Sequence, residues 1–256
     1  MKKLSAGNNV FYQFDLLPRD VVFHFTSTKA SWGGDGKCRF TGDVPEIFAG
    51  YRRELAESLG LNEAQFVFPR QTHSDHIAIV ETTAREYDIP DTDALVTNIR
   101  GLCICIQTAD CVPVLLFDPE HRVVAAIHAG WRGTVGKIVT KTIELMQERF
   151  QIKAKNLIAG IGPSISAPNY EVSADVIQRF KNEFELVETL FQPSGKPGHA
   201  YLDLWEANRV LLLECGVPES QIEIAGLCSF AEASQFFSAR RDGAATGRMV
   251  TGIMLR

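Results

Sequence analysis

The sequence of 256 residues lacks long hydrophobic runs and carries no large excess of either charge. No stretch approaches the roughly 18 consecutive apolar residues of a membrane span. No apolar core follows Met1, Lys2 and Lys3, as a secretory signal requires. The net charge of −5 gives no basic surface of the kind that binds nucleic acid. We therefore expect a cytoplasmic protein that binds neither membranes nor nucleic acids.

Several sequence motifs are also missing. There is no G-x-G-x-x-G and no P-loop, so the sequence gives no basis for a nucleotide cofactor. The six cysteines form no C-x₂-C pair, because Cys103 and Cys105 are separated by a single residue. In a reducing compartment we expect the cysteines outside a functional site to be small buried side chains with free thiols.

The sequence does contain an irregular order of short β-rich segments and helical segments. Residues 112–117 and 122–128 flank a turn and predict an antiparallel hairpin. A helix is predicted between Asp43, its expected cap, and Gly60. Further helices are predicted at 134–150, 173–184, 203–215 and 231–237. This order predicts an α+β fold with one large mixed sheet or two packed sheets.

Cys111 and His128 are the residues in these β-rich segments that could carry chemistry. Neighbouring strands would bring the thiol and the imidazole together, either to share a metal or to act as a nucleophile and its base. His73, in QTHSDH, is the third candidate. Two histidines and one cysteine match a catalytic zinc, which keeps three protein ligands and an open position and lowers the pKa of its water to about 7. The spacing alone leaves the metal site and the Cys-His pair both open.

Two carboxylates are candidates to orient the histidines. Asp110 directly precedes Cys111, and Asp75 follows His73 by two residues. A carboxylate that accepts the outer N–H of a ligating imidazole fixes its tautomer. His76 makes an H-x-x-H pair with His73, but in a strand this spacing places the two on opposite faces, so we do not expect His76 to be a ligand.

Arginines form a second set of candidates. Arg70 precedes QTHS, and Arg132 follows His128. Three more stand in FFSARRDGAATGR, namely Arg240, Arg241 and Arg248. Guanidinium groups suit phosphate or carboxylate oxygens, so these residues could position a small anionic substrate, although a solvated surface is the usual place for an arginine.

Six segments together resemble one known family. They are QTHSDHI (71–77), TADCVPVLLFDP (108–119), AAIHAGWRGTVGKIV (125–139), GIGPSIS (160–166), Tyr170-Glu171-Val172 and FFSARRDGAATGRM (236–249). Spread over residues 20–256, they are similar to the laccase-domain (YfiH-like) family. Its members are described as polyphenol oxidases and as purine nucleoside phosphorylases.

The resemblance implies a single-domain α/β/β/α sandwich over residues 1–256, with mixed sheets. It places the metal ligands and catalytic residues on His73, Cys111 and His128. It also implies that zinc supports cleavage of adenosine, inosine and methylthioadenosine by phosphate, together with deamination of adenosine. The expected partners are therefore a purine nucleoside and phosphate, and we assign substrate binding to Arg70, Arg132 and Arg241. The segment 29–42 departs from the family pattern. If this segment lines the substrate site, the substrate preference of the family does not carry over to this chain.

Two alternative mechanisms remain open. His₂Cys is also a blue-copper ligand set, and copper binds N/S sites more tightly than zinc does. However, none of the four methionines stands beside the three candidates, and the six histidines form no His-x-His pair of the kind that multicopper sites use. The other alternative is a metal-free hydrolase, with Cys111 as nucleophile and His128 as base. For deamination, the sequence suggests only Asp75 or Asp110 as an acid/base.

Overall fold

Two six-stranded sheets form the centre of the protein. The computed structural model describes residues 1–6, 9–31, 36–42, 44–82, 88–185 and 187–256. The first sheet has the order β1 (Lys2–Ala6), β2 (Asn9–Gln13), β3 (Val22–Ser27), β15 (Met249–Leu255), β7 (Cys103–Thr108) and β4 (Phe66–Val67). The second has the order β14 (Ile222–Ile224), β10 (Ile158–Ile161), β8 (Val112–Asp118), β9 (Val123–Ala129), β6 (Ala94–Thr97) and β5 (Ile77–Ile79).

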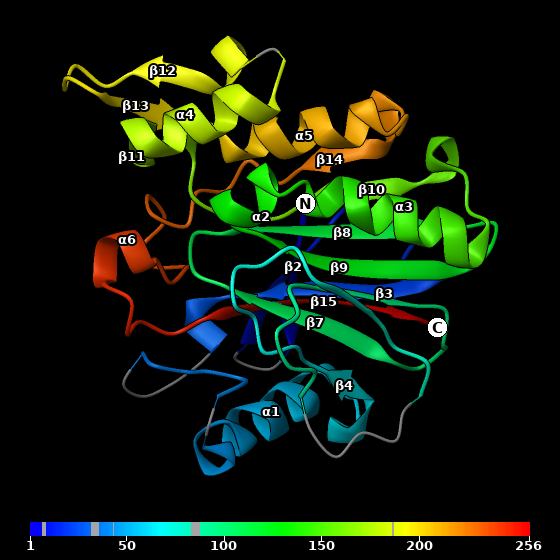
Figure 1. Ribbon diagram of the computed structural model, residues 1–256. Helices are drawn as coiled ribbons and strands as arrows, with labels where there is room; N and C mark the ends of the chain where they lie inside the picture. The colour runs from blue at the N-terminus through cyan, green and yellow to red at the C-terminus, as the bar shows by residue number, and fades with distance from the viewer. Residues whose placement is uncertain (7–8, 32–35, 43, 83–87, 186) are drawn as a thin grey trace.

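Helices cover the outer faces of the two stacked sheets (Figure 1). Helix α1 (Pro45–Leu59) lies beneath the first sheet. The outer face of the second sheet carries α2 (Trp131–Val135), α3 (Ile138–Phe150), α4 (Ala174–Glu183) and α5 (Leu204–Glu214). A small sheet, β11 (Glu171–Ser173), β13 (His199–Leu202) and β12 (Phe191–Pro193), lies beside α4. Both large sheets are mixed, which confirms the predicted α+β class and the α/β/β/α sandwich.

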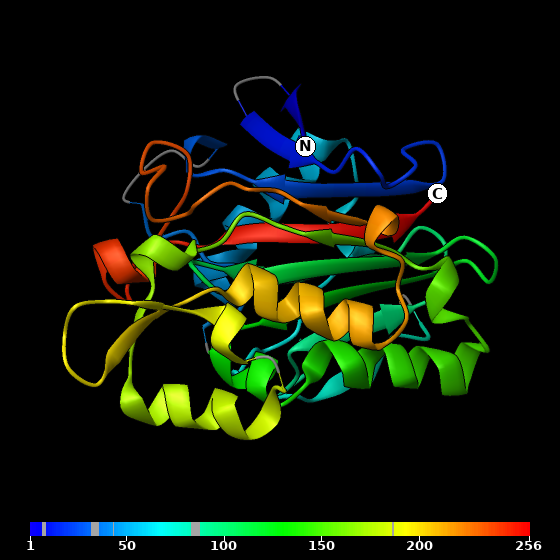
Figure 2. The ribbon, with the colours of Figure 1, turned by 90° about the horizontal axis from the view of Figure 1, so that it is seen from above.

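The remaining helical segments are short. Helix α6 (Ala239–Asp242) lies at one side of the sandwich, apart from the helices of the outer layers (Figure 2). Single 3₁₀ turns occur at Lys29–Ser31, Glu63–Gln65, Ala154–Asn156, Ala167–Asn169, Val187–Leu190 and Glu219–Gln221. No helix in the described ranges combines the length and the apolar character needed to cross a membrane.

Alternating side chains on the strands build three apolar layers. On β7, Cys103 and Cys105 pack on the α1 side of the first sheet, whereas Ile104 and Ile106 face the second sheet. This alternation follows from the two-residue period of a strand. Both thiols are free and fully buried, as the sequence predicts. The third layer packs α3 and α5 on the second sheet.

The predicted hairpin is confirmed, since β8 and β9 pair antiparallel with Val112 opposite Ala129. This register brings Cys111 to the end of the hairpin that holds His128. The helix predicted at 134–150 is instead divided between two helices, α2 and α3, because Lys137, the N-cap of α3, takes a left-handed conformation (φ 58°) between them. Helices at 173–184 and 203–215 are confirmed in α4 and α5.

The prediction of a helix at 231–237 is wrong. This segment forms turns, because its backbone is engaged by other parts of the chain. The amide of Phe237 donates to the sulfur of Met249, and the carbonyl of Gln235 accepts from the amide of Lys29. Asp43, the predicted cap of α1, lies outside the described residues, as do residues 32–35 of the segment 29–42 that departs from the family pattern.

Candidate metal centre

Three separate segments bring His73, Cys111 and His128 together. His73 lies in the connection between β4 and β5, Cys111 directly precedes β8, and His128 belongs to β9. One ligand atom from each residue lies within 4.8 Å of the other two. The two imidazole rings meet edge to face, with centroids 4.9 Å apart. The structure therefore places side by side the three residues that the sequence singled out.

The backbone around this group is shaped for close approach. His73 has a positive φ of 61°, and Asp110, next to Cys111, has a φ of 95°. Gly130 follows the β9 strand, where a Cβ atom would lie 3.0 Å from the Cys111 sulfur and 3.3 Å from the His73 ring. A side chain at this position would press on both ligand side chains, so Gly130 allows the close packing of Cys111 and His73.

Asp93, just before β6, holds two of the three residues in place. Its carboxylate accepts a hydrogen bond from Nδ1 of His128 at 2.7 Å and one from the backbone amide of His73 at 3.1 Å. The amides of Thr72 and Ser74 also donate to it. With Nδ1 engaged, His128 presents Nε2 as its ligand atom.

Sequence reasoning missed Asp93, and the two carboxylates that it suggested do not contact the histidine rings. Asp75 forms an ion pair with Lys141. Asp110 accepts from the Ser229 hydroxyl and the Arg240 amide. The proposed role of Asp75 and Asp110 in orienting the histidines is therefore corrected.

Mutual charge interactions set the protonation of the group. Burial disfavours the charged form of Cys111, but His128 and His73 outweigh burial and lower its pKa to about 6. Burial likewise opposes protonation of His128, but Cys111 and Asp93 raise its pKa to about 9. Burial also works against ionisation of Asp93, yet its contacts with His128 and Ser74 hold its pKa well below the usual range. The two imidazoles therefore favour the thiolate form of Cys111, the form that binds metals.

The donor set fits a divalent metal. Two imidazoles and a thiolate are the ligand types that zinc and copper accept. His128 is buried, but His73 is exposed and Cys111 half-buried, so the group opens on one side toward a cavity. Within the described ranges this is the one cluster of three such ligands. The Met249 sulfur accepts from the Phe237 amide inside the core, and none of the described residues that line the adjoining cavity is a methionine.

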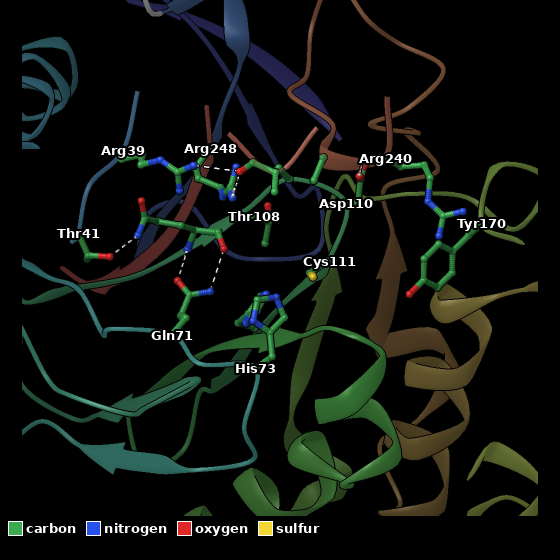
Figure 3. Close-up of a pocket in the computed structure, with 15 residues that line it drawn as sticks. Arg39, Thr41, Gln71, His73, Thr108, Asp110, Cys111, Tyr170, Arg240 and Arg248 are labelled. Carbon is green, nitrogen blue, oxygen red and sulfur yellow. Dashed lines mark hydrogen bonds between the residues drawn. The ribbon is translucent and has the colours of Figure 1, made fainter. Parts of the chain in front are cut away.

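The cavity has a volume of about 510 Å³, within the usual range for small-molecule sites. Figure 3 shows its wall, which includes His73, Cys111, Thr108, Asp110, Tyr170, Gln71 and three arginines. Gln71 and the backbone of Gln107 bond to each other in both directions, which fixes one side of the cavity.

Arg39 and Arg248 form a cationic pair on this wall. Both guanidinium groups donate to backbone carbonyls, among them that of Ala244. Burial and the neighbouring Arg39 lower the pKa of Arg248. Among the described residues, neither arginine has an ion pair with a carboxylate. Two guanidinium groups at a cavity, neither in ion-pair contact with a carboxylate, suit an oxyanion.

The three arginines that the sequence assigned to substrate binding lie elsewhere. Arg70 is exposed, and the exposed Arg132 stacks on the Trp131 ring at 4.5 Å. Arg241 donates to three backbone carbonyls and pairs with Asp242, so its side chain stabilises a loop. None of the three lines the cavity, whereas Arg240 and Arg248 from the same C-terminal motif do. Arg39 lies in the segment that departs from the family pattern, so the motifs gave no signal for it.

Fold and site together define an α+β sandwich protein with a His-Cys-His group, able to bind a metal, at the wall of a small-molecule cavity. The family described as multi-copper polyphenol oxidoreductase laccase matches residues 37–256. The chain belongs to this laccase-like family, which confirms the resemblance seen in the sequence motifs.

Individual relatives agree with this assignment. A purine nucleoside phosphorylase of Bacteroides thetaiotaomicron is 37% identical over 248 residues, covering 91% of this chain and 92% of that protein. Adenosine deaminase RL5, from an unknown prokaryotic organism, is 38% identical over 230 residues, or 87% of each chain. The crystal structure of YlmD from Geobacillus stearothermophilus matches with a TM-score of 0.88 and 31% identity, covering 99% of this chain and 98% of that chain.

Proposed function

We propose that this protein is a zinc-dependent purine nucleoside phosphorylase that also deaminates adenosine. The observation that carries the proposal is the Arg39–Arg248 pair, which lines the same cavity as the His-Cys-His group. The names of the relatives, purine nucleoside phosphorylase and adenosine deaminase, support the substrate class. Adenosine, inosine and methylthioadenosine are the substrates we propose.

In this proposal, Arg39 and Arg248 bind inorganic phosphate and hold it for attack on C1′ of the ribose. A phosphate oxygen forms a bond to C1′ while the bond from C1′ to N9 breaks. The electron pair of that bond leaves with the purine, which takes up a proton. The products are the free base and ribose 1-phosphate, or 5-methylthioribose 1-phosphate from methylthioadenosine.

Asp110 is the one carboxylate on the described cavity wall, so we assign the proton transfers to it. Its two oxygens are oriented by Ser229 and by the Arg240 amide, and each still has a lone pair for a further contact. Asp75, the other candidate from the sequence, is bound to Lys141 and does not line the cavity.

His73, Cys111 and His128 would hold the metal, which when bound supplies a Lewis acid and activates water. The residues of the chain contribute the geometry of this centre. Asp93 fixes the His128 ring, and Gly130 lets the His73 and Cys111 side chains approach each other. The open side toward the cavity leaves room for substrate beside the three ligands.

The test is product analysis with the purified protein and inosine or adenosine. We expect hypoxanthine or adenine only when phosphate is present, and inosine from adenosine without phosphate. Metal removal with a chelator should abolish both activities, and zinc should restore them. Base release without phosphate, or full activity after metal removal, would contradict the proposal. The latter result would favour a metal-free Cys111–His128 hydrolase.

A copper-dependent phenol oxidase is the second candidate, favoured by the description of the family. His₂Cys can hold copper, but none of the described residues that line the cavity is a methionine, the residue that commonly completes a blue-copper site. Oxidation of a phenol that requires added copper, without any phosphate-dependent base release, would establish this function instead.

A further inference from the structure

Thr108 carries a buried hydroxyl group without a partner on the wall of the cavity. The residue is 1% exposed, and its Oγ1 atom has no hydrogen-bond partner in the described part of the chain. By contrast, Thr26 and Thr251 on neighbouring strands of the same sheet bond to each other. Buried hydroxyl groups in folded proteins are nearly always paired. Since Thr108 lines the cavity, a ligand that draws its hydroxyl group toward the cavity can supply the missing partner.

The position of Thr108 indicates which part of a ligand it meets. Thr108 ends strand β7 and lies opposite Met249, the residue that follows Arg248. It precedes Cys111 by three residues. In Figure 3 its side chain lies between the guanidinium groups of Arg39 and Arg248 and the side chains of His73 and Cys111. Thr108 therefore lies between the cationic pair and the candidate metal ligands.

Under the proposed function, on which this inference rests, phosphate occupies the cationic pair and the purine lies toward the His-Cys-His group. The ribose then lies between them, with C1′ beside the phosphate. The 2′-hydroxyl is on the carbon next to C1′, so it is the sugar hydroxyl nearest to the reacting centre. A hydroxyl group both donates and accepts, as Thr108 Oγ1 does.

We propose that Thr108 binds the 2′-hydroxyl of the substrate and makes the enzyme select ribonucleosides over 2′-deoxyribonucleosides. A 2′-deoxy substrate leaves the buried Thr108 hydroxyl without a partner, and sites built to bond a substrate hydroxyl reject analogues that lack it. For one neutral hydrogen bond we expect a preference of about 10- to 100-fold in kcat/KM.

The experiment compares inosine with 2′-deoxyinosine at saturating phosphate, for the wild type, Thr108→Val and Thr108→Ser. Valine matches the shape of threonine and suits a strand, and serine keeps the hydroxyl. Thr108→Val should lower kcat/KM for inosine about 10-fold or more and leave that for 2′-deoxyinosine nearly unchanged, which removes the preference. Thr108→Ser should retain the preference. The melting temperature of each variant checks the fold.

Three other results overturn the inference in distinguishable ways. If Thr108→Val slows both substrates equally and raises the KM for phosphate, Thr108 contacts phosphate and does not recognise the sugar. If the wild type cleaves both nucleosides equally well, no 2′-hydroxyl recognition exists, although the proposed function stands. If the wild type fails to cleave inosine with phosphate, the proposed function itself fails, before any variant is compared.

Discussion

The Nδ1 atom of His128 lies 2.7 Å from Oδ1 of Asp93, and the same carboxylate accepts from the backbone amide of His73. One side chain thus sets the ring orientation of one candidate ligand and the main-chain position of another. The pKa of Asp93 is held low, so the carboxylate stays ionised throughout the neutral range. This arrangement makes Asp93 a positioning residue for the two histidines of the centre.

We therefore predict that Asp93→Asn lowers the affinity for zinc by about 10- to 100-fold, as the loss of an outer-shell partner does in other zinc sites. The asparagine amide cannot accept from all the donors that surround Asp93. Competition with a chromophoric zinc chelator measures the change. Asp75→Asn is the matched control, since Asp75 pairs with Lys141 and lies outside the centre. Equal zinc affinity in the two variants would refute this role for Asp93.

Replacing Cys111 separates the metal mechanism from the metal-free one. Under the proposed function, Cys111→Ala and His128→Ala should each lose both bound metal and phosphorolysis, because two ligands hold zinc too weakly. Metal analysis of the purified variants, alongside product formation, measures both properties. Cys215→Ala, which removes a half-buried thiol at the end of α5, should retain both. A Cys111→Ala protein that keeps its metal but loses all activity would instead indicate a nucleophilic cysteine.

The hairpin that carries Cys111 and His128 could be predicted from the sequence, because its strands are apolar and adjacent in the chain. His73 is already a third candidate from its motif, but its spacing to the other two leaves a shared site open until the family resemblance is added. Its segment leaves β4 in the first sheet and enters β5 in the second, so the contact depends on how two sheets stack. Local periodicity carries no information about that packing. Asp93 was missed for the same reason.

The cationic pair shows a second limit of sequence reasoning. Arg39 and Arg248 are far apart in the chain, and backbone hydrogen bonds join their segments: Gly247 to Gly36, and Arg248 to Cys38. The spacing of residues in a sequence does not predict which distant loops pair. The motif FFSARRDGAATGR contains three arginines, which the sequence cannot tell apart. The structure shows that Arg240 and Arg248 line the cavity, whereas Arg241 donates hydrogen bonds to backbone carbonyl groups.

Substitution of Arg248 tests the phosphate site. We predict that Arg248→Gln raises the KM for phosphate by about 10- to 100-fold, because it removes a charged donor to the anion. The KM for inosine at saturating phosphate should change much less. Steady-state kinetics with each substrate varied in turn separate the two effects.

The phosphate KM of Arg70→Gln tests the assignment of phosphate binding made from the sequence against the one made from the structure. Arg70 is exposed and does not line the cavity, so its phosphate KM should stay within about twofold of the wild type. A larger effect from Arg70→Gln than from Arg248→Gln would show that phosphate binds outside the described cavity.

His24 makes the stability of the protein depend on pH independently of the candidate metal centre. It lies fully buried on β3, where its Nδ1 atom has no partner among the described residues, and burial lowers its pKa from 6.5 to about 4. Between these values the unfolded chain binds a proton that the folded chain does not, so stability falls as pH falls from about 6.5 to 4. The shift corresponds to about 3 kcal/mol of unfolding free energy.

Urea unfolding at pH 7 and pH 4 should show this loss in the wild type, on top of losses from carboxylates, and a smaller loss in His24→Gln. Equal pH dependence in the two proteins would show that His24 is not the responsible group.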